Sequence, residues 1–176
     1  MGAAGVYTEG PSASTARGML RAMWTLVDED EAATIGHFET FGLAVLRAPV
    51  DVAFFDRVGG VMQVLSEHDR FSMLIVRAGT LPGQLSGLAR ERAIALMKQH
   101  GDRLNGFGYV LSGGGLKARM LRGAMNAVLK TAKFPAKVFT DPGAAVSWMI
   151  DQRGQPASLR QARAEIAAEV SRLVQA

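Results

Sequence analysis

A glycine-rich turn is the part of this sequence whose residue types and spacing best suit the binding of a charged group. Ser112-Gly113-Gly114-Gly115 lies between a short apolar block and a regular amphipathic segment. Successive glycines let backbone N–H groups converge at a helix N-terminus, where an anion is favoured. The turn is neither a G-x-G-x-x-G fingerprint nor a Walker A loop, so a plain flexible connection is the competing interpretation. The residues that could bind an anion or a partner here are Ser112, Gly113, Gly114, Gly115, Lys117, Arg119 and Arg122.

Positive charge extends well beyond this turn. No Asp or Glu occurs between Asp102 and Asp141, whereas that stretch is rich in Lys and Arg. Such a basic surface could receive an acidic partner protein, a phosphorylated ligand or an anionic head group, or it could be an ordinary solvated face. No nucleic-acid-reading module accompanies the charge, so we expect no nucleic-acid partner. The basic residues are Arg103, Lys117, Arg119, Arg122, Lys130, Lys133 and Lys137.

Other residues that commonly carry chemistry form no recognisable set. The sequence lacks cysteine, which removes disulfides, thiolate metal sites and cysteine nucleophiles together. His37, His68 and His100 stand far apart without a carboxylate at zinc-site spacing, so we expect neither a metal nor a cofactor. No serine lies in a Gly-x-Ser-x-Gly elbow, and neighbouring carboxylates fall in a loop, a helix cap and a helix end. We therefore predict that the protein is not an enzyme.

The composition favours one globular domain in the cytoplasm. The chain has 176 residues, of which 48% are hydrophobic and 20% are charged, enough for a single core. Its net charge of +4 is modest. No apolar run approaches the roughly 18 residues of a membrane span, and the first residues lack the pattern of a signal peptide. Residues 1–22 are rich in Gly, Ala, Ser and Thr, so we expect a disordered tail there.

Alternating strand and helix patterns predict the scaffold that positions these residues. Short apolar or alternating blocks predict strands, and apolar residues at every third or fourth position predict helices. We therefore predict an α/β fold: a mixed, mostly parallel sheet with an antiparallel N-terminal edge strand and helices on the sheet. The predicted strands are residues 23–27, 38–46, 71–78, 107–111 and 136–140, and the predicted helices begin near residues 51, 85, 116, 142 and 158. Asp51 and Asp141 are predicted N-caps, and Ser158 is predicted to form a capping box with Gln161.

Two segments of the chain are similar to a known family. Lys-Val-Phe-Thr-Asp-Pro at 137–142, followed by Ala-Ala-Val-Ser-Trp-Met at 144–149, is similar to the final strand and "A-x-x-W-L" helix of bacterial STAS and CRAL-TRIO-like proteins. Residues 109–122, YVLSGGGLKARMLR, resemble their fourth strand and third helix. With its element order, the chain resembles the STAS domain of anti-sigma-factor antagonists. The resemblance implies a STAS-like domain over residues 23–153, then a linker and a C-terminal helix over residues 154–176.

The resemblance also implies a site on the loop after the third strand of the family. In STAS antagonists this loop carries an Asp-Ser dipeptide whose serine is phosphorylated by a partner kinase. The tail Ser86-Gly87-Leu88 matches that motif, but Gln84 and Leu85 occupy the places of the aspartate and the modified serine. Ser86 and Thr80 are the candidate phospho-acceptors, because a phosphate at a helix start meets free N–H groups. The competing interpretation is that Ser86 only caps the helix.

For function, the resemblance implies a non-catalytic protein-interaction and regulatory module in bacterial signalling. The expected partner is a regulatory kinase-like or other signalling protein, and an anionic ligand or a homodimer stays open. Two alternatives remain: a small-ligand or lipid carrier of CRAL-TRIO-like type, and an assembly protein that acts through its C-terminal helix. The apolar seam of that helix is short, which favours packing on its own domain. It contains Leu159, Ala162, Ile166, Val170 and Leu173.

Overall fold

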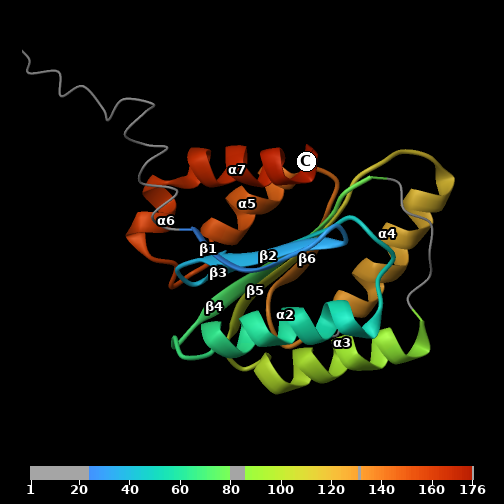
Figure 1. Ribbon diagram of the computed structural model, residues 1–176, viewed down its shortest axis with the longest axis horizontal. Helices are drawn as coiled ribbons and strands as arrows, with labels where there is room; N and C mark the ends of the chain where they lie inside the picture. The colour runs from blue at the N-terminus through green and yellow to red at the C-terminus, as the bar shows by residue number, and fades with distance from the viewer. Residues whose placement is uncertain (1–23, 80–85, 131, 176) are drawn as a thin grey trace, which may run out of the picture.

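Six strands form one sheet in the order in which they occur along the chain (Figure 1). The computed structural model describes residues 24–79, 86–130 and 132–175. The strands are β1 (Trp24–Glu29), β2 (Ala33–Phe38), β3 (Phe41–Leu46), β4 (Phe71–Arg77), β5 (Leu104–Leu111) and β6 (Ala136–Phe139). The helices are α2 (Val52–Leu65), α3 (Gly87–His100), α4 (Leu116–Leu129), α5 (Pro142–Ile150), α6 (Ala157–Gln161) and α7 (Arg163–Gln175).

The sheet is mixed and mostly parallel. Strands β3, β4, β5 and β6 run parallel to one another, whereas β2 is antiparallel to both of its neighbours, β1 and β3. β1 therefore forms the N-terminal edge of the sheet, and β6 forms the opposite edge. The predicted α/β fold class, with its antiparallel N-terminal edge, is confirmed.

One strand, β2, was absent from the predicted elements. We predicted a single strand over residues 38–46, but β2 occupies the preceding residues and ends at Phe38, and β3 begins at Phe41, so Phe38 pairs with Phe41 across a tight turn. A two-residue hairpin turn usually contains Gly or Asn, which makes it recognisable in a sequence. Here Glu39 adopts the positive φ of 48° instead, so the turn carried no compositional signal.

Gly36 inside β2 also weakened the sequence pattern by which that strand could have been predicted. A Cβ on Gly36 would lie 2.4 Å from the carbonyl oxygen of Thr25 and 2.6 Å from the ring of Trp24. The close approach of β1 to β2 therefore requires glycine at this position, although an isolated glycine normally weakens a strand pattern. Such a requirement comes from a neighbouring strand and is invisible within the segment itself.

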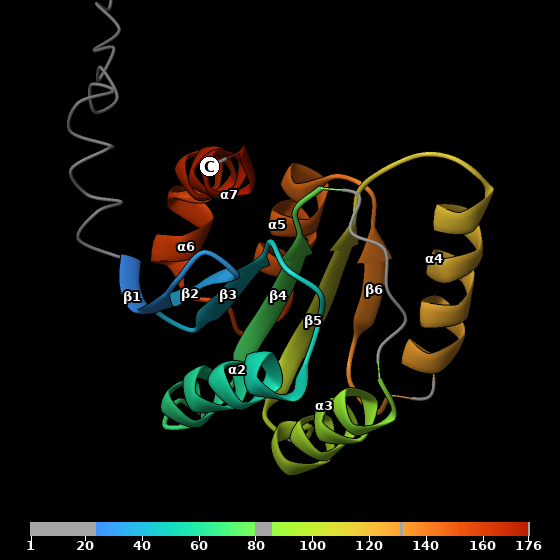
Figure 2. The ribbon, with the colours of Figure 1, turned by 45° about the vertical axis from the view of Figure 1, so that its right-hand side comes forward.

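Helices cover both faces of the sheet (Figure 2). Right-handed connections that all advance in one direction place their helices on one face, and α2, α3 and α4, which connect β3 to β6, contribute to one core. α5, α6 and α7 build a second core on the other face. The alternation of side chains along β4 feeds both: Phe71, Met73 and Ile75 face the first core, and Leu74 and Val76 face the second.

Two aspartates begin helices at the ends of parallel strands, as predicted. The backbone N–H of Phe54 donates to the Asp51 carboxylate at 2.8 Å, and that of Ala144 donates to Asp141 at 2.7 Å. Each carboxylate satisfies an N–H group that has no partner inside its helix. The caps fix where α2 follows β3 and where α5 follows β6.

The C-terminal helix differs from its predicted form. We expected a helix starting at Ser158 with a capping box to Gln161, but α6 begins at Ala157, so Ser158 lies inside the first turn and cannot cap it. The Ser158 hydroxyl donates to the Glu39 carboxylate at 2.8 Å instead. The chain then continues as α7, and the apolar seam is buried in the second core. Its buried residues are Leu159, Ala162, Ile166, Val170 and Leu173.

A buried glutamine ties this C-terminal segment to the sheet. Gln155 is only 4% exposed, and its side-chain nitrogen donates to the Ser72 hydroxyl at 2.6 Å and to the Met149 carbonyl at 3.2 Å. The hydroxyl of Thr40 donates to the side-chain oxygen of Gln155 at 3.0 Å. One side chain thus satisfies buried groups on β4, on α5 and in the β2–β3 turn.

We predict that Gln155→Leu lowers the free energy of unfolding by about 2–4 kcal/mol. The substitution leaves the buried hydroxyls of Thr40 and Ser72 without their hydrogen-bond partner, which costs about 1–3 kcal/mol for each group. Urea unfolding followed by circular dichroism measures the loss. The matched control is Gln99→Leu at an exposed position of α3, which should change stability by less than about 0.5 kcal/mol. Equal effects of the two variants would contradict this role for Gln155.

Candidate functional site

The parallel strands β3 to β6 all end on one side of the sheet, which we call the carboxyl edge. Ligands of open α/β sheets bind outside these strand ends. The carboxyl edge includes the glycine turn after β5, the start of α4, and Arg77 at the end of β4. The sequence-predicted anion or partner residues of the glycine turn and α4 therefore lie at the carboxyl edge.

The three glycines of the turn are exposed to solvent. Gly113 and Gly115 have φ angles of +107° and +89°, a conformation that favours glycine. Ideal Cβ atoms on Gly113, Gly114 and Gly115 would meet nothing within 4 Å. Ser112, the residue before them, anchors the turn by donating its hydroxyl to the Thr140 carbonyl at 3.3 Å.

Arg122 fixes the turn from within α4. Its Nη1 donates to the carbonyl oxygens of Leu111 at 3.2 Å and of Gly113 at 3.0 Å. These bonds satisfy the last carbonyl of β5 and one carbonyl of the turn, so the guanidinium positions the turn as well as supplying positive charge. Arg119, by contrast, is exposed to solvent. The structure describes the backbone of Lys117 but not its side chain, which lies outside the described atoms.

A buried arginine lies close to the turn, and sequence reasoning missed it. Arg77, the last residue of β4, is only 4% exposed and hydrogen-bonds to Tyr109 on the neighbouring strand β5. Burial raises the pKa of Tyr109, and the Arg77 charge and hydrogen bond partly oppose that shift. Arg77 also pairs in register with Leu111, whose carbonyl binds Arg122. The guanidinium groups of Arg77 and Arg122 therefore flank the end of β5. The sequence feature that could have indicated Arg77 is an arginine at the end of an otherwise apolar strand.

Ser86 lies away from the glycine turn. Its hydroxyl accepts the backbone N–H of Ala89 at 3.2 Å, so the predicted N-cap of α3 is confirmed. Figures 1 and 2 place the start of α3 toward the opposite end of α4 from the glycine turn. The second predicted phospho-acceptor, Thr80, lies outside the described residues, as does the loop around it.

The outer side of α4 is apolar as well as basic. Leu116 is 73% exposed and Met120 is 67% exposed, with Leu121 less so. The inner side of the same helix packs on the first core through Met125 and Leu129. Large apolar side chains that remain exposed side by side on a folded domain commonly mark an interaction surface.

The remaining basic residues of the region divide into engaged and exposed groups. Arg103 donates to the Ser66 carbonyl, and the Lys137 ammonium lies 5.1 Å from the centre of the Phe139 ring. Lys130 and Lys133 are exposed beyond the end of α4. Within this stretch, the exposed side chains of Arg119, Lys130 and Lys133 therefore lie on α4 or just beyond its end.

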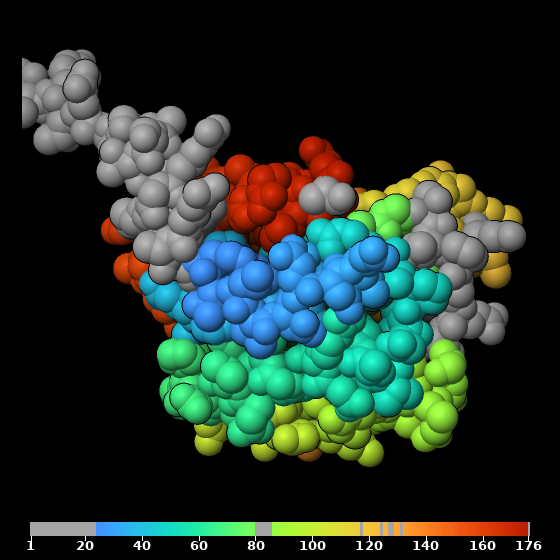
Figure 3. All heavy atoms as spheres, in the orientation of Figure 1, coloured from blue at the N-terminus to red at the C-terminus, as the bar shows by residue number. Residues whose placement is uncertain are grey.

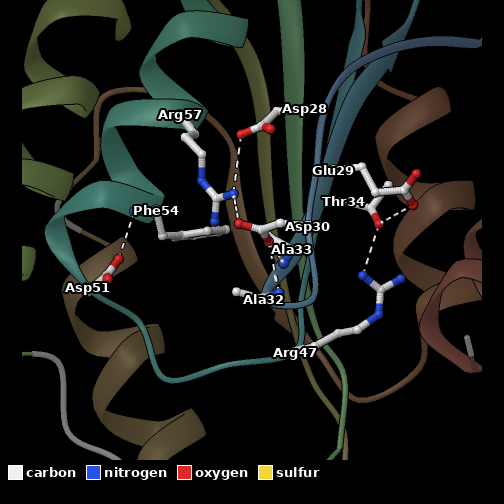
Figure 4. A network of polar contacts seen from close by, with 10 residues as sticks. All are labelled: Asp28, Glu29, Asp30, Ala32, Ala33, Thr34, Arg47, Asp51, Phe54 and Arg57. Carbon is white, nitrogen blue, oxygen red and sulfur yellow. Dashed lines mark hydrogen bonds and ion pairs between the residues drawn. The ribbon is translucent and has the colours of Figure 1, made fainter.

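The acidic run after β1 has a structural role. Arg57 of α2 forms ion pairs with Asp28 at 3.2 Å and Asp30 at 2.7 Å (Figure 4). Asp30 also accepts the backbone N–H groups of Ala32 and Ala33, and these bonds, the Ala33 bond first, together with the Arg57 charge lower its pKa against the opposing effect of burial. A surface hollow of about 310 Å³ lies beside this network. Figure 3 shows β1, β2 and α2 side by side on this face.

No catalytic or metal-binding set emerges within the described part of the chain. Among those residues, no group of three or more His, Asp or Glu side chains could hold a metal ion. No helix of the described segments is long and apolar enough to cross a membrane. A second surface hollow, of about 530 Å³, lies at the end of the sheet opposite to the carboxyl edge and is lined by polar residues, among them Glu67, His100, Asp102 and Arg103.

Comparisons with known proteins identify the fold. No family model matches the sequence, and no curated protein is significantly similar to it. Among solved structures, the chain is similar to an uncharacterized protein of the DUF3478 family from Shewanella loihica PV-4, described as having a SpoIIAA-like fold. Sequence identity is 14%, the TM-score is 0.50, and the match covers 71% of this chain and 99% of that chain.

The chain has a STAS-like fold. The sequence resemblance to STAS domains is therefore confirmed at the level of fold, over most of the chain. At 14% identity the likeness carries no site residues, so the roles of the glycine turn and of Ser86 rest on the geometry of this STAS-like chain alone. The division into a tail, residues 23–153 and residues 154–176 stays a prediction.

The buried side chain of His100 should make the stability of this STAS-like fold depend on pH. The side chain is 5% exposed, its Nε2 has no hydrogen-bond partner among the described residues, and its ring packs on the edge of Phe71. Burial, and secondarily the Arg103 charge, lower the pKa of His100 from its ordinary value of 6.5. The unfolded chain therefore takes up a proton at a higher pH than the folded chain does.

By linkage, the free energy of unfolding should decrease as the pH falls below about 6.5, until the lower pKa of the folded state is reached, and should be insensitive to this group above it. Urea unfolding at a series of pH values measures the slope. His100→Gln should flatten it, and His68→Gln at an exposed position should not. An unchanged slope in His100→Gln would show that another group is responsible.

For the turn, we predict that Arg122→Ala increases amide hydrogen exchange in residues 112–123, because two carbonyl oxygens lose their donor. Mass spectrometry of exchanged peptides locates the change. Arg119→Ala removes the same charge from an exposed position of α4 and should leave exchange in this segment unaltered. If the two variants exchanged alike, Arg122 would not be the residue that holds the turn.

Proposed function

We propose that this STAS-like chain is a non-catalytic, cytoplasmic protein-interaction module in bacterial signalling. Its binding surface consists of the glycine turn 112–115 and the N-terminal half of α4, which together we call the α4 surface. The observation that carries the proposal is the exposure of Leu116 and Met120 next to exposed Arg119. Exposed apolar side chains beside a charged one suit recognition of another protein.

The uses of the other polar groups support a binding rather than a catalytic role. The acidic run is tied to Arg57, the two helix-capping aspartates accept backbone N–H groups, and Gln155 holds buried hydroxyls. A nucleophile, a base and an orienting group converging on a cleft would be needed for catalysis. The polar groups described here are engaged in holding the fold.

The partner that we propose is a regulatory kinase-like or other signalling protein. A phosphate on Ser86 would meet the N–H groups and the favourable dipole at the start of α3. The Ser86 hydroxyl already caps that helix, so phosphorylation would exchange one cap for a stronger one. The α4 surface would then bind the partner, and Ser86 would be a separate place at which the interaction is regulated.

Site-specific photo-cross-linking tests this function. A benzophenone amino acid replaces Met120 in the full chain, in the cells that naturally make the protein, and irradiated samples are compared by immunoblotting. We expect a discrete heavier species from position 120. The matched control replaces Val64, which is also exposed but lies on α2, and should give no such species. Identical patterns from both positions, or none from position 120, would contradict the proposed surface.

A further inference from the structure

Gly123 is a glycine that the chain's own packing does not require. It lies in the middle of α4, where glycine costs about 1 kcal/mol relative to alanine. An ideal Cβ built on it meets nothing within 4 Å among the described atoms. A side chain at this position would therefore fit within the monomer, in contrast to Gly36, where a Cβ would collide with a neighbouring strand.

The glycine continues the apolar stripe of the α4 surface. Leu116, Met120 and Gly123 are spaced at i, i+4 and i+7, so they follow one line along the helix. This line lies on the solvent side, because Met125 and Leu129 direct the opposite side of α4 into the first core. The stripe consists of two large apolar side chains followed by a notch without a side chain.

Positive charge borders the stripe and no acidic residue offsets it along the chain. Arg119 is exposed within α4, and Lys130 and Lys133 are exposed just beyond its end. The sequence contains no Asp or Glu between Asp102 and Asp141. An occupant of the stripe must therefore carry negative charge at its rim, since like charges there would repel it.

We propose that the α4 stripe binds an acidic amphipathic helix of another protein, an inference that rests on the proposed function and specifies its partner. Apolar side chains at i, i+4 and i+7 of the partner helix contact Leu116 and Met120, as in other helix-in-groove complexes. The partner backbone approaches most closely over Gly123, because the distance between packed helices depends on side-chain size at the contact. Its Asp and Glu residues lie toward Arg119 and Lys130.

A lipid surface fits the same stripe less well. Stable membrane attachment of a surface helix requires a large apolar face or a second anchoring signal. The stripe offers only Leu116 and Met120, with Leu121 to one side. A notch at Gly123 contributes nothing to insertion into fluid lipid, whereas it permits close contact with a rigid helix.

The test uses the full chain and a fluorescent peptide of about 18 residues, stapled so that it stays helical, with Leu at the contact positions and Glu elsewhere. Fluorescence anisotropy should show binding that weakens on raising salt from about 0.05 M to 0.5 M. Met120→Glu should reduce the affinity at least about tenfold, whereas Val64→Glu on α2 should leave it unchanged.

Gly123→Ala supplies the sharpest result, because its two effects have opposite signs. It should raise the melting temperature of the free chain, since alanine favours the helix, and it should weaken peptide binding at least about threefold, since it fills the notch. A variant that bound poorly because it was misfolded would melt lower instead. Unchanged binding in Gly123→Ala would overturn the proposed close approach.

Three further outcomes would also overturn the inference. The first is that the acidic peptide does not bind, and the second is that a peptide with Lys substituted for Glu binds equally well. The third is that the chain sediments with phosphatidylcholine–phosphatidylserine vesicles in a Met120-dependent way but does not bind the peptide. A Met120-dependent dimer of the free chain would assign the stripe to a second copy. Each leaves the cross-linking result at position 120 as an independent measure of whether the α4 surface binds a protein at all.

Discussion

α4 packs on β6, a four-residue strand at the edge of the sheet, and the proposed binding surface depends on this packing. The connections from β3 to β6 advance in a single direction, so each crossover helix lies farther along the sheet than the one before. α4 is the last of these crossover helices, and the strand that follows it, β6, is the edge of the sheet. It is covered on its inner side, through Met125 and Leu129, and open on its outer side, where Leu116 and Met120 meet solvent. A helix placed over the middle of the sheet would have had neighbours on both flanks.

The two faces of the sheet differ in the polar contacts that accompany their apolar cores. The face that carries α5, α6 and α7 is closed by buried apolar residues and by the hydrogen bonds of Gln155. The face that carries α2, α3 and α4 includes the buried Arg77 and Tyr109 pair and the Arg122 bonds that fix the glycine turn. Negative charge near β1 is held by Arg57, at a distance along the sheet from the basic region around α4.

Much of the fold followed from local patterns in the sequence. Asp51 and Asp141 were predicted as helix caps because a cap is a local interaction between a side chain and the next turn, and both are confirmed. Capping was one of two interpretations of Ser86, and its hydroxyl does cap α3. The features that were missed depend on contacts between distant segments. β2 was hidden by a turn at Glu39 without turn residues, and the expected cap at Ser158 failed because the helix begins one residue earlier and Glu39 is its partner.

The same distinction applies to the candidate site. The glycine turn and its basic neighbours were visible in the sequence, because glycine runs and charge runs are local. The burial of Arg77, the folding back of Arg122 onto two carbonyls and the outward direction of Leu116 and Met120 arise only when β4, β5 and α4 are assembled. We propose that the outer side of α4 recognises an acidic helix of another protein. Methyl NMR of the methionine-labelled chain measures this contact, since adding the acidic peptide should shift the exposed Met120 methyl and leave those of buried Met62, Met73 and Met149 in place. An unmoved Met120 signal, or shifts spread over the buried methyls, would contradict it.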